Sequence, residues 1–126
     1  MEDHEGKKIL VIQTHGVETP TRTYSPLFYA VAAAAMEMEV MVWFTMNGTN
    51  QLKKGAAEQV QLDPTSDVTL KTMLQMAMDN DVKLRVCQQS LTLWNMTPAD
   101  LIDGVSILGA TSIIDLALEA DHVMYF

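Results

Sequence analysis

Hydrophobic positions along the chain fall into short continuous runs, separated by longer segments in which apolar residues recur at helical spacing. The short runs are rich in β-branched and aromatic residues and end in charged or turn-forming residues, a pattern typical of buried parallel strands. The fourth run is brief enough to be a strand or a turn. The predicted strands are Lys7–Gln13, Glu39–Phe44, Val82–Cys87, Ser106–Gly109 and Asp121–Phe126.

The segments between these runs predict helices. Ser25 is placed to cap a helix that has Pro26 at its first position, and Ser66 or Asp67 is placed to cap the next one. The predicted helices run from Pro26 to about Met38, from Ser66 or Asp67 to about Asn80, from Gln88 to Trp94, from a cap at Thr97 and Pro98, and from Thr111 to Ala120. The segments expected to stay irregular, or to form only a short turn, are Val17–Thr23 and Gln51–Pro64.

Alternation of strands and helices indicates βαβ units and a parallel sheet. We therefore expect a single-domain α/β protein, a flavodoxin-like three-layer sandwich with a mostly parallel sheet of about five strands and helices on both faces. In the flavodoxin-like order the first strand lies between the second and the third. That order would place the loops after Gln13 and Cys87 side by side. The domain is expected to span residues 1–126, with residues 1–6 as a flexible acidic tail.

The charge and composition of the chain limit which partners and which compartment are expected. Eight basic residues against sixteen acidic ones give a net charge of −8, which repels nucleic acids and anionic membranes and favours a basic protein partner. The longest apolar run, Leu27–Met36, is too short to span a bilayer. The acidic start of the chain lacks the positive charge of a signal peptide, and a lone cysteine fits a reducing compartment. We therefore expect a cytoplasmic protein that binds neither nucleic acid nor membrane.

The same apolar run also predicts an assembly. Leu27–Met36 is apolar on every face, so one side should pack on the sheet and the other against a second subunit. A homo-oligomer is expected on this ground. The alternative is a monomer in which exposed alanines are tolerated on the outer face.

Cys87 is the one cysteine of the chain and the main candidate for chemistry. It stands at the carboxyl end of a predicted strand and beside a predicted helix start, where parallel sheets place ligands and where backbone N–H groups favour a thiolate. The alternative is a buried cysteine that acts as a small hydrophobe. The acidic excess opposes ionisation, since a negative field raises the pKa of a thiol.

Two charged or titratable neighbours are candidates to activate Cys87. Arg85 shares its strand face because side chains alternate, although it is equally placed to be a solvated strand end. His15, in the loop after the first strand, would lie near Cys87 if the first and third strands were neighbours. The alternative for His15 is an exposed residue with no role.

Three further residues are candidates to support the pocket. Ser90 is placed to donate a hydrogen bond to the sulfur or to act as a helix cap, and Trp94 to wall the pocket or to pack in the core. Asn47 follows the second strand and, in the alternative, only shapes the turn. Scattered histidines with one cysteine make no zinc site, and no glycine-rich phosphate loop occurs. No metal or cofactor is therefore expected.

Several segments together resemble the DsrE/DsrF-like family of small sulfur-relay proteins. These segments are Lys8–Ile12, Val86–Ser90, Asp100–Val105, Gly109–Ala110 and Glu119–Phe126. The resemblance implies a flavodoxin-like sheet and assembly as a dimer, trimer or hexamer. It also implies that a cysteine, Cys87 here, accepts sulfur as a persulfide and passes it to a carrier protein of the TusA type. The stretch 88–96 departs from some relatives in having no glycine.

The leading hypothesis is thus a sulfur-carrier or sulfurtransferase-like protein with Cys87 as the persulfide site. The alternative is a non-enzymatic oligomeric binding module in which Cys87 only packs. A third interpretation is a redox sensor in which Cys87 is oxidised or paired between subunits.

Overall fold

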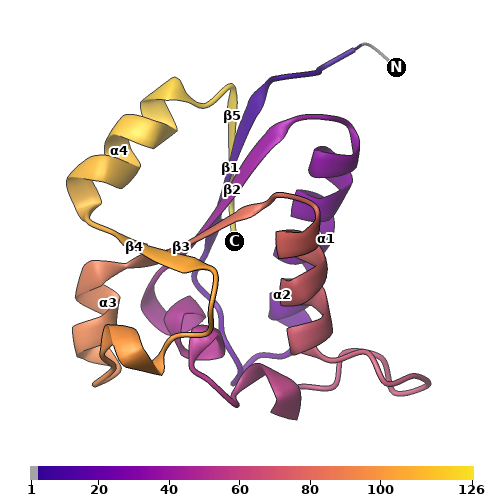
Figure 1. The fold of residues 1–126 in the computed structure, drawn as a ribbon, viewed down its shortest axis with the longest axis vertical. Coiled ribbons are helices and arrows are strands. Elements are labelled where there is room, and N and C mark those ends of the chain that lie inside the picture. The colour runs from indigo at the N-terminus through magenta and orange to yellow at the C-terminus, as the bar shows by residue number, and fades with distance from the viewer. Residues whose placement is uncertain (1–2) are drawn as a thin grey trace.

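A five-stranded, fully parallel sheet forms the centre of the protein, in a computed structural model that describes residues 3–126 (Figure 1). The strand order across the sheet is β4-β3-β2-β1-β5. The predicted α/β class, the parallel sheet and the fourth strand are confirmed. The strands are β1 (Lys8–Gln13), β2 (Glu39–Phe44), β3 (Lys83–Cys87), β4 (Val105–Leu108) and β5 (His122–Tyr125).

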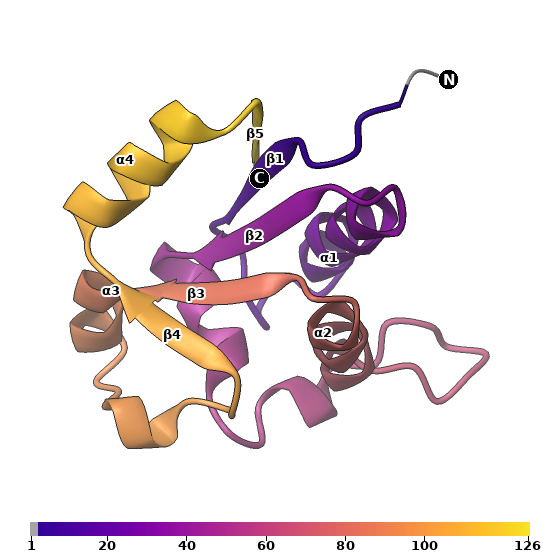
Figure 2. The same ribbon diagram turned by 45° about the horizontal axis from the view of Figure 1, so that its top comes forward.

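Helices cover the sheet on both faces, as expected. The two helices α1 and α2 lie side by side on one face, whereas α4 lies on the other face, with α3 on the same side at the end of β3 (Figure 2). The α-helices are α1 (Thr21–Ala35), α2 (Leu70–Asp79), α3 (Gln88–Leu93) and α4 (Ala110–Glu119). Three short 3-10 helices are η1 (Met46–Leu52), η2 (Ala57–Gln59) and η3 (Pro98–Asp100).

The predicted order of strands is wrong at its centre. β2, not β1, lies between its two neighbours β1 and β3, and β1 pairs with β5 on its other side. The loops after β1 and β3 are therefore separated by the end of β2. Strand order depends on pairing between distant segments, which the local pattern of hydrophobic residues does not encode.

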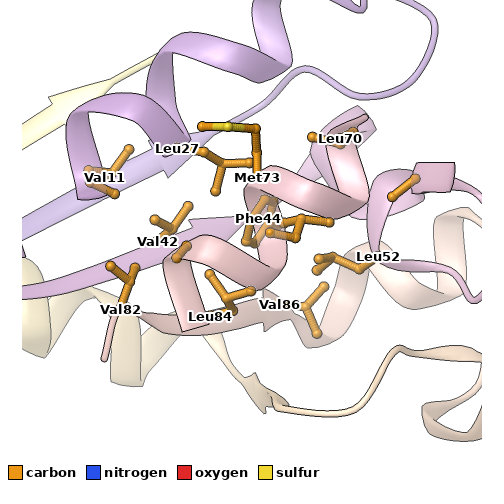
Figure 3. Packing of buried hydrophobic residues seen from close by; sticks show 14 of the residues in the cluster. Val11, Leu27, Val42, Phe44, Leu52, Leu70, Met73, Val82, Leu84 and Val86 are labelled. Atoms are coloured by element: carbon orange, nitrogen blue, oxygen red, sulfur yellow. The ribbon is translucent and has the colours of Figure 1, made fainter. Parts of the chain in front are cut away.

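The core lies between the sheet and the helices α1 and α2. Alternate residues of the strands point into it, and Val42, Leu84 and Val86 are fully buried there in one cluster with Leu27 of α1 and Leu70 of α2 (Figure 3). The intervening strand residues point to the opposite face of the sheet. This second face carries the candidate cysteine.

Helix α1 begins four residues before the predicted cap. Ser25 lies inside the helix, and Pro26 is an internal residue without the N–H that would bond to the Arg22 carbonyl. The buried side chain of Gln13 replaces that bond, since its Nε2 donates to the Arg22 oxygen at 3.0 Å. The Gln13 side chain of β1 thus allows the helix to begin at Thr21, whereas the preference of proline for the first helical position predicted a start at Pro26.

Helix α2 begins later than predicted. Residues 66–69 run antiparallel to residues 60–62, and Leu62 N donates a hydrogen bond to the Val68 carbonyl. The backbone before Thr69 is therefore extended, and it is paired with this neighbouring segment instead of forming a helical turn. The cap is Thr69, whose hydroxyl accepts a hydrogen bond from Thr72 N at 3.4 Å. Ser66 instead accepts from Val68 N within the preceding turn.

The start of the chain was expected to be a flexible acidic tail. Residues 1–2 lie outside the described residues, and Gly6 N donates to the Glu37 carbonyl at 2.9 Å, so the end of this segment contacts the α1–β2 turn. None of the helices described for residues 3–126 combines the length and apolar character that crossing a bilayer requires.

We expect Leu84→Ala to lower the free energy of unfolding by about 2–5 kcal/mol, because it removes buried methyl groups from the centre of the core and leaves a cavity. The matched control is Leu118→Ala in α4, where the leucine is 82% exposed and the change should stay within about 0.5 kcal/mol. Urea unfolding followed by circular dichroism measures both. Equal losses in the two variants would contradict the assigned core.

Candidate functional site

Cys87 ends β3 and serves as the N-cap residue of α3. Its neighbour Val86 points into the core, so alternation directs the Cys87 side chain to the second face of the sheet. The residue is 7% exposed, and the thiol therefore lies just beneath the surface at the carboxyl edge. The predicted position at a strand end beside a helix start is confirmed.

Two hydroxyl groups lie next to this thiol. Phe44 of β2 pairs with Val86, so Thr45 follows directly alongside Cys87. Thr45 Oγ1 lies 3.3 Å from Ser90 Oγ, and Ser90 Oγ also accepts a hydrogen bond from Met46 N at 2.9 Å. Ser90 is buried, so its hydroxyl is held between the end of β2 and the first turn of α3.

These donors decide the protonation of Cys87. Burial is the largest single influence and raises the pKa of the Cys87 thiol. Hydrogen bonds from the Ser90 side chain and backbone, from the Thr45 hydroxyl and from the Gln89 N–H together outweigh it, so the net pKa lies below the ordinary value. The site therefore shifts the Cys87 equilibrium toward the thiolate relative to an ordinary cysteine, and the thiolate is the form that acts as a nucleophile.

The backbone of Met46 is held from two sides above this group. Its N–H donates to Ser90 Oγ, and its carbonyl accepts a hydrogen bond from Trp94 Nε1 at 2.8 Å. Met46 adopts a left-handed conformation, φ 51°, which a non-glycine residue takes up only at a cost. The loop after β2 and the end of α3 are thus joined directly beside Cys87.

Within residues 3–126, the candidates His15 and Asn47 form no side-chain hydrogen bond to Cys87, Thr45 or Ser90. His15 follows β1, and its ring Nδ1 lies 3.3 Å from Thr14 Oγ1. Because β2 separates β1 from β3, the reason for pairing His15 with Cys87 no longer holds. Asn47 is exposed in η1 after β2, and the side chain that donates to the Glu18 carboxylate is that of Asn50, whose Nδ2 lies 2.7 Å from Glu18 Oε2.

Arg85 does share the second face with Cys87, as alternation predicted. Its Nη1 donates to the carbonyl of Leu84 at 2.9 Å, so the guanidinium group is held near its own strand. Ser90 and Trp94 are the two predicted supporting residues that the structure brings into the network next to the thiol. The Trp94 ring is 39% exposed, so it does not pack in the core, and its Nε1 donates to the Met46 carbonyl.

Sequence reasoning missed Thr45 and Met46. Both follow β2 directly, so they meet Cys87 only because β2 and β3 are neighbours in the sheet. A correct strand order would have found them, since the ends of adjacent parallel strands lie at one edge.

The rest of the molecule was searched for groups that could hold a metal ion or a cofactor. Among residues 3–126 no group of three or more His, Cys, Asp or Glu side chains is arranged to hold a metal ion. A hollow of about 810 Å3 lies at the opposite edge of the sheet, lined in part by Lys8, Glu39 and Lys83 at the starts of three strands. It does not include Cys87.

Comparison with known proteins identifies the family of this chain. The model of the DsrE/DsrF-like family matches residues 7–126, which include every element of the sheet. The chain belongs to the DsrE/DsrF-like family. The resemblance drawn from the sequence is thereby confirmed.

Individual relatives agree with this assignment. The sulfur carrier protein DsrE2 of Allochromatium vinosum is 26% identical, over 96% of this chain and 99% of the relative. The crystal structure of the ychN protein from E. coli superposes with a TM-score of 0.79 at 20% identity, covering 95% of this chain and 99% of that one. The protein of unknown function MTH1491 from Methanobacterium thermoautotrophicum gives a TM-score of 0.73 at 14% identity, over 97% and 100%. These two superpositions show that this chain shares the fold of both proteins.

We expect Ser90→Ala to raise the pKa of Cys87, because the variant loses a hydroxyl that donates to the thiolate while burial remains. The thiolate absorbance in the ultraviolet, followed through a pH titration, should move to higher pH, so that less thiolate is present at neutral pH. Thr45→Val should shift the titration in the same direction.

Thr92→Ala is the matched control, since Thr92 lies exposed on the same short helix. An unchanged titration in Ser90→Ala and Thr45→Val, or an equal shift in Thr92→Ala, would show that the hydroxyl pair does not set the thiolate.

Proposed function

We propose that this protein is a sulfur carrier that accepts sulfane sulfur as a persulfide on Cys87 and relays it to the thiol of a partner. The observation that carries the proposal is the set of hydrogen-bond donors which lowers the pKa of Cys87 despite its burial. The relative named as a sulfur carrier, which aligns along nearly the whole chain, supports the same chemistry.

The loading step uses the thiolate as nucleophile. Cys87 Sγ attacks the terminal sulfur atom of a polysulfide, a new S–S bond forms on Cys87, and the polysulfide leaves one sulfur shorter. In the delivery step a partner thiolate attacks the outer sulfur of the persulfide. The bond to Cys87 Sγ then breaks, and Cys87 returns to the thiolate. The sulfur atom moves in each step with no external oxidant or reductant.

The same donors serve both steps. Hydrogen bonds from Ser90 and Thr45 stabilise negative charge on Sγ, which is the attacking atom in loading and the leaving atom in delivery. His15 has no part in this proposal, because the end of β2 lies between its loop and β3.

The low exposure of Cys87 favours a second candidate, an oligomeric binding module without chemistry in which Cys87 packs against its neighbours. The two candidates differ in how the thiol reacts. A carrier requires that sulfur donors reach Sγ in the folded protein, whereas a packing cysteine stays unmodified until the protein unfolds.

The oligomeric state of the carrier is also part of the proposal. A homo-oligomer is favoured by α1, whose outer side exposes Tyr24, Phe28 and Tyr29. The Tyr24 and Phe28 rings stack at 5.5 Å, and Tyr29 lies 5.9 Å from the ring of Phe126, so these aromatic residues form one continuous stripe. Exposed apolar patches of this kind mark interaction sites.

The partner in delivery is proposed to be a TusA-like carrier protein. The net charge of −8 favours a basic partner. The cytoplasm, which keeps thiols reduced, is the proposed compartment because Cys87 must return to the thiolate after each delivery.

Incubation with polysulfide or thiosulfate, followed by intact-mass measurement, should show a gain of one sulfur atom in the native protein and none in Cys87→Ser. The reason is that Cys87 is the one cysteine in the chain. Loss of the added mass on treatment with dithiothreitol identifies a persulfide. A native protein that takes up no sulfur from either donor, but reacts after unfolding, supports the packing role and excludes the carrier.

Sedimentation velocity should show the native protein as an oligomer, and Phe28→Glu should shift it toward the monomer by placing a charge in the aromatic stripe. Leu118→Glu is the matched control, since it adds the same charge to an exposed apolar side chain of α4. A monomeric native protein, or dissociation by Leu118→Glu in place of Phe28→Glu, would show that the stripe is not the interface.

A further inference from the structure

An exposed apolar surface borders the thiol. Met46 is 52% exposed, Leu93 is 76% exposed, and the Trp94 ring lies partly at the surface beside them. We call these three residues the apolar collar. Two elements supply it, the turn after β2 and the end of α3.

The collar is linked by hydrogen bonds to the helical turn that begins at Cys87. Ser90 lies three residues after Cys87 in that turn, its Oγ accepts from Met46 N, and Trp94 Nε1 donates to the Met46 carbonyl. Leu93 and Trp94 follow Ser90 by three and four residues in the same helical segment, so both side chains lie on its side of the helix. The collar therefore lies on the surface beside the turn that holds Cys87.

The charge around the collar is unusual for this chain. Residues 40–52 and residues 86–99 contain no charged side chain, and these two uncharged stretches meet at Cys87, in a protein of net charge −8. The carboxylate of Glu18 accepts a hydrogen bond from Asn50 Nδ2 at 2.7 Å, so it stands at the border of the uncharged surface. Contact at the collar is thus apolar, while the surrounding field attracts positive charge.

We infer that the apolar collar is the docking surface for a positively charged protein segment whose reactive cysteine is flanked by apolar side chains. The inference rests on the proposed function and specifies its partner. The partner's flanking side chains cover Leu93 and Trp94, and its thiolate attacks the outer sulfur carried by Cys87. The S–S bond to Cys87 breaks and the persulfide passes to the partner, as in the delivery step above.

Burial explains why the partner needs such a segment. Cys87 is only 7% exposed, so a thiol in transit must be held close to it, and apolar contact at the collar supplies that binding. Contact also excludes water and small thiols from the persulfide. A small hydrophilic thiol lacks both advantages and should accept sulfur slowly.

The test uses the full-length protein loaded with inorganic polysulfide and two synthetic acceptor peptides of equal length and equal lysine content. In one peptide leucine and methionine flank the cysteine, and in the other serine and glutamine do. Intact mass over time measures the loss of sulfur from Cys87. The apolar peptide should take sulfur about tenfold faster, a difference that corresponds to about 1.4 kcal/mol of contact.

Leu93→Ser should slow delivery to the apolar peptide about fivefold and leave loading by polysulfide unchanged, because Leu93 contributes apolar surface and lies mostly outside the fold. Leu118→Ser is the matched control. Leu118 is a helical leucine of similar exposure, 82% against 76%, and it lies near the end of α4 that borders the hollow at the opposite edge of the sheet, so delivery should stay at the native rate. Exchanging the lysines of the apolar peptide for glutamates should slow delivery at low salt.

Equal delivery to both peptides, or an equal effect of Leu93→Ser and Leu118→Ser, overturns the docking surface while the carrier function stands. Indifference to the peptide's charge overturns the positive charge assigned to the partner. A native protein that polysulfide does not load overturns the proposed function, and the docking role with it.

Discussion

The side chain of Gln13 is the constraint on which the carboxyl edge of the sheet depends. It is fully buried at the end of β1, donates through Nε2 to Arg22 and accepts through Oε1 from the backbone N–H of His15 at 2.9 Å. Its own carbonyl accepts from Thr45 N at 3.0 Å. A buried amide with fewer partners would cost about 1–3 kcal/mol, so these bonds hold together the start of α1, the loop after β1 and the end of β2.

Thr45 transmits that constraint to the candidate site. Its backbone is fixed by Gln13 and its hydroxyl faces Ser90 and Cys87, so the position of a donor at the thiol depends on a residue two strands away. Burial and hydrogen bonding act on the pKa of the Cys87 thiol in opposite directions, and the donors of Ser90, Thr45 and Gln89 together outweigh burial. A nucleophilic thiol can thus remain beneath the surface of an acidic protein.

The sequence pattern predicted what depends on local order. The strands were found because runs such as residues 39–44 combine β-branched and aromatic residues, and Cys87 was found because it ends such a run. Strand order, and with it Thr45, was not predictable in this way, because pairing between β2 and β3 depends on contacts across the core. The start of α1 was missed for a related reason, since the donor that compensates for Pro26 comes from β1.

The position of Cys87 combines two requirements that oppose each other. Burial protects a persulfide from water and stray thiols, but it also raises the thiol pKa and restricts access. Polar donors inside the site correct the pKa, whereas an apolar surface outside it, Leu93 and Trp94, offers binding energy to the molecule that must reach the sulfur. A more exposed cysteine would need neither feature and would deliver sulfur to any thiol. The burial of this one is therefore the physical basis for selectivity in the proposed relay.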